Sequence, residues 1–376
     1  MPLDRLFAAL ALVCAVCAGI YNVLTVIAAA RFRARRTGGK IVQQPATIII
    51  PLKGDSGTLE EELRRFCLQD YPEYQIVFAL ESEADPAMAA VRRVIAAFPK
   101  RDLAVAHWSG AVLANPKENS HAAALRLAKH ELIVLADGDV LAGPDYLAKV
   151  LEPLADPRVG LASFPYRFIG ASSFLQRLKG LTIHAGFLPS VLVAWLLAPV
   201  RFGIGATMAV RRKALEAIGG FEAVGDFLAS DFYLAHKISA AGWRVELGRH
   251  FLDIRLEPLD WRTFRRWQLR WTRTMRFTEP AGYAGLVVTQ GLSWAVIYLA
   301  LTRGALGWLV LALTLAIRWL CLWLVWGQAG VHDSLLLAPV YDLAASAFWA
   351  TGWLGREVYW GGRPFLLESG TKIRTR

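Results

Sequence analysis

The stretch "LIVLADGDV", Leu132 to Val140, decides the predicted fold. Its first five residues are apolar, and Asp137 and Asp139 follow with a single glycine between them. A short apolar run that ends in turn residues is typical of a strand buried on both faces of a parallel sheet. Ligands of such sheets bind beyond the carboxyl ends of the strands. We therefore expect a ligand site at the two aspartates, where Gly138 lets the chain bend.

The residues before this stretch alternate between strand and helix patterns. Strands are predicted at "ATIIIPLKG", "YQIVFALES", "LAVAHW" and "ELIVLADGD", with helices at "EEELRRFCLQD", "DPAMAAVRRVIAAF" and "ENSHAAALRLAK" between them. This alternation predicts an α/β domain with a mainly parallel sheet. The loops that follow Pro51, Glu81, Trp108 and Ala136 should therefore share one edge of the sheet. The sequence has no G-x-G-x-x-G or Walker loop, and "GIGAT" (203–207) is too weak to count as either.

The amino-terminal residues have the character of a membrane anchor. The 376-residue chain is 55% hydrophobic with a mean hydropathy of +0.36, and Leu6 to Ala30 carries no charge. Such a segment is long enough to cross a bilayer, and no small-residue cleavage pattern precedes the basic run that follows it. That run consists of Arg31, Arg33, Arg35, Arg36 and Lys40. By the positive-inside tendency we expect the residues after Ala30 to lie in the cytoplasm.

Three later segments are also apolar. Leu181 to Val200 could span by length, but it contains Pro189 and a span would separate the α/β residues, so we predict a helix pair in the membrane interface. Segments 286–302 and 304–327 predict a two-span hairpin that turns near Arg303, in which Arg318 should either face protein or snorkel to the membrane surface. Segment 334–355, which contains Asp342, is predicted to be interfacial or re-entrant, because spanning would place the basic tail outside.

These patterns predict three regions. Residues 1–40 form the anchor and its basic stop. Residues 41–280 form a cytoplasmic catalytic domain with interfacial helices at 172–200 and 260–277, and residues 281–376 form carboxy-terminal membrane helices and a basic tail. The net charge of +11 favours contact with anionic lipid headgroups rather than nucleic acid, because no nucleic-acid motif occurs. The four cysteines have no paired spacing, which argues against a disulfide framework or zinc site.

Charged clusters in the predicted cytoplasmic domain each have a structural explanation. Asp85 precedes Pro86 and could cap a helix, Asp139 could cap a turn, and Asp231 could cap the amphipathic run that it begins. The segment "DWRTFRRWQLRWTRTMR" (260–276) alone is most simply a basic interfacial helix. Together the clusters also fit one chemistry. Paired carboxylates suit Mg²⁺ or Mn²⁺ on a nucleotide diphosphate, a separate aspartate suits a general base, and arginine suits a leaving diphosphate.

The ordered motifs resemble the ceramide glucosyltransferase family, glycosyltransferase family 21, which is close to the large family 2. They are "PLKGDSGTLEEELRRFCLQDYPEY", "ESEADPA", "NPKENS", "ADGDV", "SDFYLAHKISAAGWR", "LRWTR" and the tail "VYWGGRPFLL". The resemblance covers about 48–276 together with the anchor and tail. It implies a GT-A fold, a nucleotide-sugar domain on a membrane anchor. Bacterial hopanoid-biosynthesis glycosyltransferases belong to the same neighbourhood and remain an alternative.

The resemblance implies roles for particular residues. Asp85 matches the aspartate near the nucleotide, Asp137 the aspartate on the metal and diphosphate side, and Asp231 the proposed general base. Arg270 and Trp271 match the R-W of the family's (Q/R)-x-x-R-W signature, but position 267 is Trp instead of Gln or Arg. The recognition assigned to that side chain is therefore in doubt.

Other residues complete the expected site. Pro51, Lys53, Glu81 and Lys117 are expected on the nucleotide-sugar side, Asp139 beside Asp137 on Mg²⁺ or Mn²⁺, and His184 on the acceptor side. For Lys117 a plain surface position, and for His184 an ordinary interfacial histidine, are the alternatives.

The expected reaction is inverting transfer of a hexose, glucose first, from a UDP-sugar to a lipid hydroxyl, ceramide first. A processive polysaccharide synthase and a non-catalytic lipid-binding scaffold are the other hypotheses.

Overall fold

The computed structural model describes residues 3–35, 42–110, 113–327 and 332–375. The chain forms two compact units, each built from three chain segments. The helical unit comprises residues 1–35, 169–198 and 258–360, and the sheet unit comprises 36–168, 199–257 and 361–376. Arg36 and Lys40 of the basic run, and the predicted boundary between 40 and 41, lie outside the described residues. The three predicted regions therefore stay a prediction.

A seven-stranded sheet organises the sheet unit, in the order β3-β2-β1-β4-β7-β5-β8. β1, β2, β3 and β4 are parallel, β7 is antiparallel to β4 and β5, and β8 is parallel to β5. Only β7 opposes the others, so the predicted mainly parallel sheet is confirmed. The strands are β1 (Ala46–Pro51), β2 (Tyr74–Leu80), β3 (Asp102–His107), β4 (Leu132–Ala136), β5 (Val159–Ser163), β7 (Thr207–Arg211) and β8 (Arg244–Leu247). A separate two-stranded sheet pairs β6 (Tyr166–Ile169) with β9 (Leu252–Arg255).

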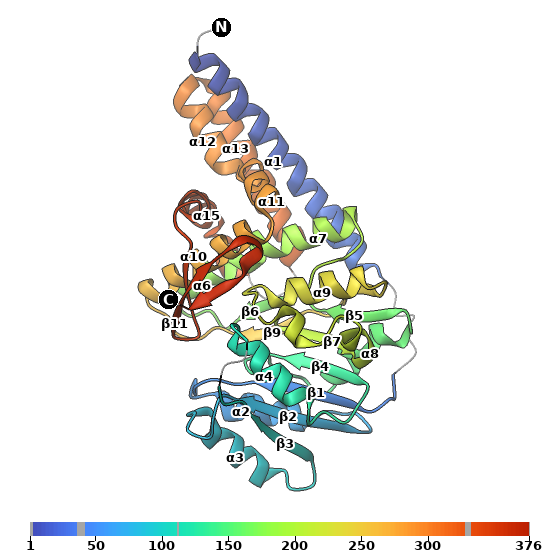
Figure 1. The fold of residues 1–376 in the computed structure, drawn as a ribbon. Helices are drawn as coiled ribbons and strands as arrows, with labels where there is room; N and C mark the ends of the chain where they lie inside the picture. Colours follow the sequence, from blue (N-terminus) through green and yellow to red (C-terminus); the bar gives the residue numbers. More distant parts are fainter. Residues whose placement is uncertain (1–2, 36–41, 111–112, 328–331, 376) are drawn as a thin grey trace. The chain divides into compact units, whose positions relative to one another are not determined.

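The predicted alternation of strands and helices is confirmed along the first part of the sheet unit (Figure 1). Ile49 of β1 pairs with Val77 of β2 and Leu135 of β4, and all three are buried in the core. Because β1 to β4 are parallel, their carboxyl ends meet at one edge, as expected. The helices are α2 (Leu59–Cys67), α3 (Ala87–Ala97), α4 (Pro116–Leu125), α5 (Tyr146–Leu151), α8 (Arg212–Glu216) and α9 (Ser230–Ala240), with short η1 (Glu152–Ala155) and η3 (Phe221–Val224).

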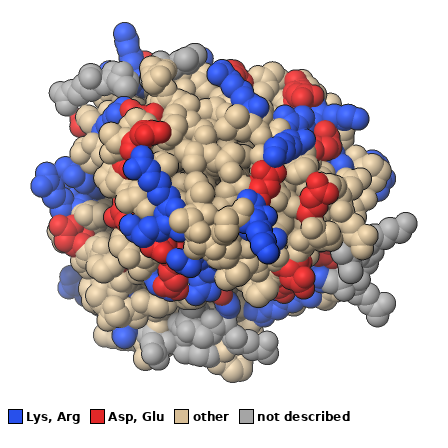
Figure 2. All heavy atoms as spheres, turned by 90° about the horizontal axis from the view of Figure 1, so that it is seen from below, with Lys and Arg blue, Asp and Glu red and all other residues tan. Residues whose placement is uncertain are grey.

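The surface of the sheet unit mixes both signs of charge. On the face in Figure 2, Lys and Arg side chains stand among Asp and Glu side chains and do not gather into one basic field. Exposed ion pairs between α2 and α3 are of this kind: Glu60 contacts both Arg64 and Arg93. Such interspersed charge provides solubility rather than a nucleic-acid footprint on this face.

Helices build the other unit, where α1 packs along α12 and α13 (Figure 1). Three segments are long and apolar enough to cross a membrane, namely Leu3–Arg33, Phe174–Leu197 and Ala305–Trp326. A bent pair, Pro280–Thr289 with Gly291–Thr302, raises the number to as many as four. The elements are α1 (Leu3–Arg33), α6 (Phe174–Leu181), the π-helix η2 (Thr182–Phe187), α7 (Leu188–Leu197), α10 (Trp261–Thr278), α11 (Pro280–Gly285), η4 (Leu286–Thr289), α12 (Gly291–Thr302), α13 (Ala305–Trp326), α14 (His332–Leu335), α15 (Ala338–Gly352) and the strand β10 (Glu357–Trp360).

The hairpin predicted after Pro280 has the expected turn, and its two membrane spans stay a prediction. Arg303 forms the turn, in the left-handed conformation with φ 49°, and α13 follows it. Segment 286–302 is not one straight helix, because the chain leaves helical geometry at Gln290 (φ −86°, ψ 58°) and bends by 54° there. The apolar composition carried no signal of this break. The interfacial placement of segments 172–200 and 334–355 stays a prediction.

Arg318 of α13 faces protein, which is one of the two predicted alternatives. Its Nε and Nη2 donate to both carboxylate oxygens of Asp342 at 3.0 and 2.8 Å, and Nη2 also donates to the carbonyl of Ala185 at 2.9 Å. Nη1 reaches Oδ1 of Asn22 at 3.3 Å. One guanidinium therefore connects α13 to α1, η2 and α15. The bidentate ion pair also neutralises two charges that would be costly to expose to lipid hydrocarbon.

We predict that Asp342→Leu destabilises the protein by about 3–5 kcal/mol, because it leaves the buried Arg318 cation without its anion. The measurement is the unfolding midpoint in detergent. The double variant Arg318→Met with Asp342→Leu should recover most of the loss, and Arg303→Met at the exposed turn serves as the control. Equal stability of the single and double variants would contradict the argument.

Candidate active site

Asp85 connects two loops at the carboxyl edge of the sheet. Its Oδ1 accepts from the backbone N–H of Ala87 at 2.9 Å, which caps the start of α3, and from the N–H of Gly54 at 2.8 Å. The capping alternative is thus correct for Asp85, but the same oxygen also fixes the loop after β1. Pro51 ends that strand and pairs with Ala79 of β2.

Asp137 immediately follows β4 and carries the shortest polar contact of this edge. Its N–H donates to the carbonyl of Ala206 at 3.0 Å, and its Oδ1 accepts from Nζ of Lys117 at 2.5 Å. Lys117 stands in the first turn of α4, which Asn115 caps by accepting from the Lys117 N–H. Lys117 is therefore not a plain surface lysine: α4 directs it at the strand end.

Asp139 differs from Asp137 in its surroundings. Its side chain reaches solvent, yet protein atoms around it displace much of the remaining water, and this desolvation with the nearby Asp137 carboxylate raises the pKa of Asp139 to about 7. Its carboxylate accepts only from its own backbone N–H among the described residues. In the described part of the chain, the Asp139 side chain accepts no hydrogen bond from the turn that follows, so the turn-capping alternative has no support.

Lys117 also lies close to Asp231. Its Nζ donates to the carbonyl of Gly205 at 3.2 Å, and charge interactions link it to both Asp137 and Asp231. Burial would lower the pKa of Lys117, but the charge of Asp137 and its hydrogen bond, with the charges of Asp231 and Glu118, together outweigh burial and raise the pKa. The ammonium is therefore a positive charge that interacts with both aspartates.

Asp231 is held in the first turn of α9 without capping that helix. The cap position is Ala229, and the Asp231 Oδ1 accepts only from the neighbouring Phe232 N–H, at 2.9 Å. Burial raises the pKa of Asp231, which Lys117 partly opposes. A carboxylate of raised pKa is a stronger proton acceptor when ionised.

Two glycines of "GIGAT" make room for Asp231. A Cβ on Gly203 would come within 2.3 Å of the Asp231 carbonyl oxygen, and one on Gly205 within 2.8 Å of Oδ2. The stretch serves close packing, a role that its sequence did not indicate. Asp231 lies 26 residues after Gly205, beyond β7, α8 and η3, so no local pattern gave a signal of this contact.

A buried polar network beneath Asp231 was also not predicted. Glu118 Oε1 accepts from the Ser230 hydroxyl at 2.7 Å, and Oε2 contacts Nδ1 of His121 at 3.1 Å. Burial opposes ionisation of Glu118, but His121 and Ser230 hold its pKa below the ordinary value. Because Ser230 precedes Asp231, this network fixes the start of α9 against α4. The i, i+3 spacing of Glu118 and His121 was the available sequence signal.

The carboxy-terminal tail reaches the same edge of the sheet. Nζ of Lys53 donates to the carbonyl of Gly361 at 2.7 Å, and Nη2 of Arg363 donates to Glu81 at 3.1 Å. The tail hairpin of β11 (Arg363–Leu367) and β12 (Ile373–Thr375) is attached through a bridge between Phe227 and Lys372. The predicted donor-side residues Lys53 and Glu81 are thus engaged by the tail.

The remaining predicted residues belong to the helical unit. Trp271 of α10 packs edge-on against Phe187 at 5.1 Å and beside Trp267 at 5.3 Å, and Arg270 precedes it on the same helix. His184 is buried in η2 against Trp326, whose indole donates to the His184 carbonyl at 2.7 Å. The assigned roles of these three residues stay predictions.

The strand-end carboxylates suit a divalent cation that has further ligands of its own. Within the described residues, no three His, Cys, Asp or Glu side chains are grouped to hold a metal by themselves. Mg²⁺ in phosphate sites is bound through one or two carboxylates plus phosphate oxygens and water. Asp137 and Asp139 fit that donor set, and the mutual repulsion that raises the pKa of Asp139 is what a cation would relieve.

Comparisons with known proteins agree with this architecture. The family model described as "Glycosyl transferase family 21" matches residues 9–373. "Ceramide glucosyltransferase 1" of Caenorhabditis elegans is 26% identical over 209 residues, 54% of this chain and 44% of the relative. "Ceramide glucosyltransferase" of Gibberella zeae is 31% identical over 133 residues, 33% of this chain and 25% of the relative. The matches thus span less than half the length of these curated relatives.

A solved structure has a similar fold. The mannosyltransferase PcManGT from Pyrobaculum calidifontis, in complex with GDP-Man and Mn²⁺, superposes with a TM-score of 0.60 over 93% of this chain and 98% of that chain. At 20% identity this likeness concerns the fold alone. The fold is of the GT-A glycosyltransferase type, as the sequence predicted.

We predict that the protein loses stability as pH rises from about 4 to 7, through Asp139. In this window the folded state keeps a proton on Asp139 that the unfolded state has released, so raising the pH favours unfolding. The unfolding midpoint without divalent cations should fall over this range. Asp139→Asn should reduce the fall of the unfolding midpoint with pH, whereas Asp55→Asn on the exposed loop after β1 should leave it unchanged. An unchanged pH profile in the Asp139 variant would contradict the assignment.

Proposed function

The chain belongs to glycosyl transferase family 21, and from that premise we propose a membrane-bound inverting glycosyltransferase that moves a hexose from a UDP-sugar to a lipid hydroxyl. Glucose is the first candidate sugar and ceramide the first candidate acceptor, because curated relatives are named ceramide glucosyltransferase. One observation carries the proposal: at the carboxyl edge of the sheet, Lys117 donates a hydrogen bond to Asp137 and also interacts with the charge of Asp231.

The donor would bind at the strand-end loops. Lys117 places a cation where a diphosphate would arrive, and Asp85 fixes the loop after β1. Asp137 and Asp139 would hold Mg²⁺ or Mn²⁺, which neutralises diphosphate charge when bound. Lys53 and Glu81, with the tail residues that engage them, would border the nucleotide.

Asp231 would act as the general base. As the acceptor oxygen bonds to the anomeric carbon, the bond from that carbon to the diphosphate oxygen breaks, and Asp231 receives the hydroxyl proton. Inversion follows from this single displacement. Its raised pKa suits proton acceptance near neutral pH. Arg270 would stabilise the departing UDP, with Trp271 beside it on α10.

The lipid acceptor would come directly from the membrane. The candidate spans support membrane attachment, and the basic residues Arg31, Arg33 and Arg35 at the end of α1 favour a cytoplasmic catalytic unit beside anionic headgroups.

One experiment identifies the reaction. Purified protein is incubated with Mn²⁺ or Mg²⁺, several UDP-sugars, and ceramide or a hopanoid alcohol, and the products are identified by mass spectrometry. A monoglucosylated ceramide is the expected product. A glycosylated hopanoid would show that a hopanoid, and not ceramide, is the acceptor. A polymer would indicate a processive synthase. The absence of both sugar transfer and UDP-sugar hydrolysis would favour a non-catalytic scaffold.

We predict that Asp231→Asn lowers kcat by about 10²- to 10⁴-fold, because the base is lost, while UDP binding is retained. Asp226→Asn, on the exposed loop just before α9, is the matched control with near-normal turnover. Normal turnover of the Asp231 variant would remove it from the mechanism.

Gly205→Ala should lower kcat by about 10- to 100-fold, since the added Cβ must displace the Asp231 carboxylate by a fraction of an ångström or more. The donor KM should change little. Gly143→Ala, where the nearest atom lies at 3.5 Å, is the control. A large rise in KM with unchanged kcat would argue against a role for Gly205 in placing the base.

A further inference from the structure

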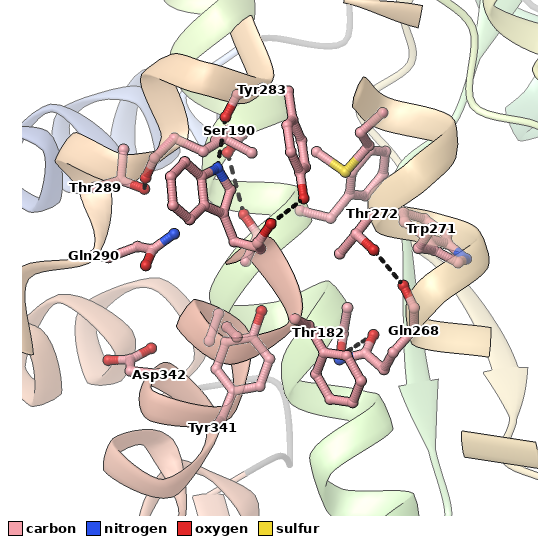
Figure 3. Close-up of a pocket in the computed structure, with 18 of the residues that line it drawn as sticks. Thr182, Ser190, Gln268, Trp271, Thr272, Tyr283, Thr289, Gln290, Tyr341 and Asp342 are labelled. Carbon is pink, nitrogen blue, oxygen red and sulfur yellow. Dashed lines mark hydrogen bonds between the residues drawn. The ribbon is translucent and has the colours of Figure 1, made fainter. Parts of the chain in front are cut away.

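The helical unit encloses a cavity of about 130 Å³, lined entirely by residues of that unit (Figure 3). It lies among α1, η2, α10, α13 and α15, with η4 and α11 at another side. Polar side chains in a membrane-type helical bundle are costly and are retained where they bind or transport something. Many side chains that face this cavity are polar, which indicates that the cavity binds a ligand.

The lining is electrically balanced. Its only ionisable residues of opposite charge are Arg318 and Asp342, which form the bidentate pair described above. Arg318 donates further to backbone and amide oxygens, so no excess cation faces the space. A phosphate or carboxylate group would find no counter-charge there, whereas an uncharged polar group would meet hydroxyls and amides.

The cavity depends on a local departure from α-helical geometry. η2 is a π-helical turn, a feature often found at functional sites, and Gly186 lies within it. A Cβ on Gly186 would come within 2.3 Å of the Tyr341 hydroxyl oxygen. Glycine thus allows that hydroxyl to sit against the turn at the cavity wall (Figure 3).

One face of α10 supplies the most specific group. Gln268, Trp271, Thr272 and Met275 recur at i, i+3, i+4 and i+7 and all line the cavity. Gln268 is only 3% exposed, and its Oε1 accepts from the Thr182 hydroxyl at 3.2 Å. Its amide nitrogen has no acceptor among the described residues, and the carboxamide of Gln290 also lines the space (Figure 3). An amide donor without an acceptor, at the wall of a cavity whose surface is largely apolar, is suited to a ligand carbonyl or hydroxyl.

We propose that this cavity binds the uncharged head of a membrane lipid that carries amide and hydroxyl groups, and that Gln268 determines its specificity. The assignment rests on the proposed function in that such a lipid would be the acceptor. Trp271 and Trp349 provide flat apolar walls for the first carbons below the head. Position 268 places the Gln268 carboxamide on the buried face of α10, whereas the centroid of the Trp267 ring lies 5.3 Å from the Lys179 ammonium.

The test is direct photo-crosslinking to the full chain in nanodiscs. The probe is an N-acyl amino-diol lipid with a diazirine next to the head, and crosslinked peptides are mapped by mass spectrometry. We expect labels on η2 and α10. The same lipid without the diazirine should compete, diacylglycerol should compete about tenfold less well, and an anionic phospholipid should not compete at equal concentration.

Variants identify the contact. Gln268→Leu should reduce labelling about tenfold, through loss of the donor, and Thr182→Val, which is nearly isosteric, should reduce it to a smaller extent. Arg265→Gln on the exposed side of α10 should label normally. UDP binding and the unfolding midpoint report whether each variant is folded.

The outcomes separate this inference from the proposed function. Labelling that maps outside the cavity, that anionic phospholipid displaces, or that both variants leave unchanged overturns the inference even if sugar transfer occurs. Specific labelling without transfer from any UDP-sugar supports the site and overturns the proposed function instead.

Discussion

The ion pair between Lys117 and Asp137 is the interaction on which the arrangement of the strand-end site depends. Burial and the Asp137 carboxylate raise the pKa of Asp139, and burial, Asp137 and Glu118 raise the pKa of Asp231. Unpaired buried carboxylates would become protonated or push apart. The Lys117 ammonium pairs with Asp137 and opposes the rise in the pKa of Asp231, while His121 and Ser230 lower the pKa of Glu118. The edge can therefore hold negative charge before a ligand arrives.

The sheet and the aspartates at its strand ends could be predicted from the sequence, because both follow from short-range patterns. Buried parallel strands are continuous apolar runs, so β1, β2 and β4 could be recognised, and Asp137 had to follow the last of them. Parallel order then placed Asp85 and Asp137 on one edge. Lys117 became specific only in three dimensions, because its partner lies twenty residues away along the chain and is reached through the start of α4.

Features that depend on close approach were not predictable. Gly203 and Gly205 matter because the Asp231 backbone and carboxylate occupy the space where a Cβ would stand, and no local pattern encodes that neighbour. The bend at Gln290 was missed for a related reason: the segments on both sides of it are predominantly apolar, so hydropathy alone cannot distinguish one straight span from two shorter helices. Trp267 was noted as a departure from a family signature, but the sequence did not single out Gln268, whose contact with Thr182 and place at the cavity depend on the rotation of α10.

The two aspartates of "ADGDV" end in different electrostatic states, and the difference follows from which of them has a partner. Asp137 accepts a hydrogen bond from the Lys117 ammonium, which fixes its position with no ligand present. Asp139 forms no ion pair among the described residues, and although Lys117 acts to lower its pKa, desolvation and the Asp137 carboxylate outweigh this effect and raise the pKa to about 7. A divalent cation shared by both would convert that repulsion into attraction and deprotonate Asp139. Asp137 therefore defines where a cation would be held, and Asp139 makes cation binding depend on pH.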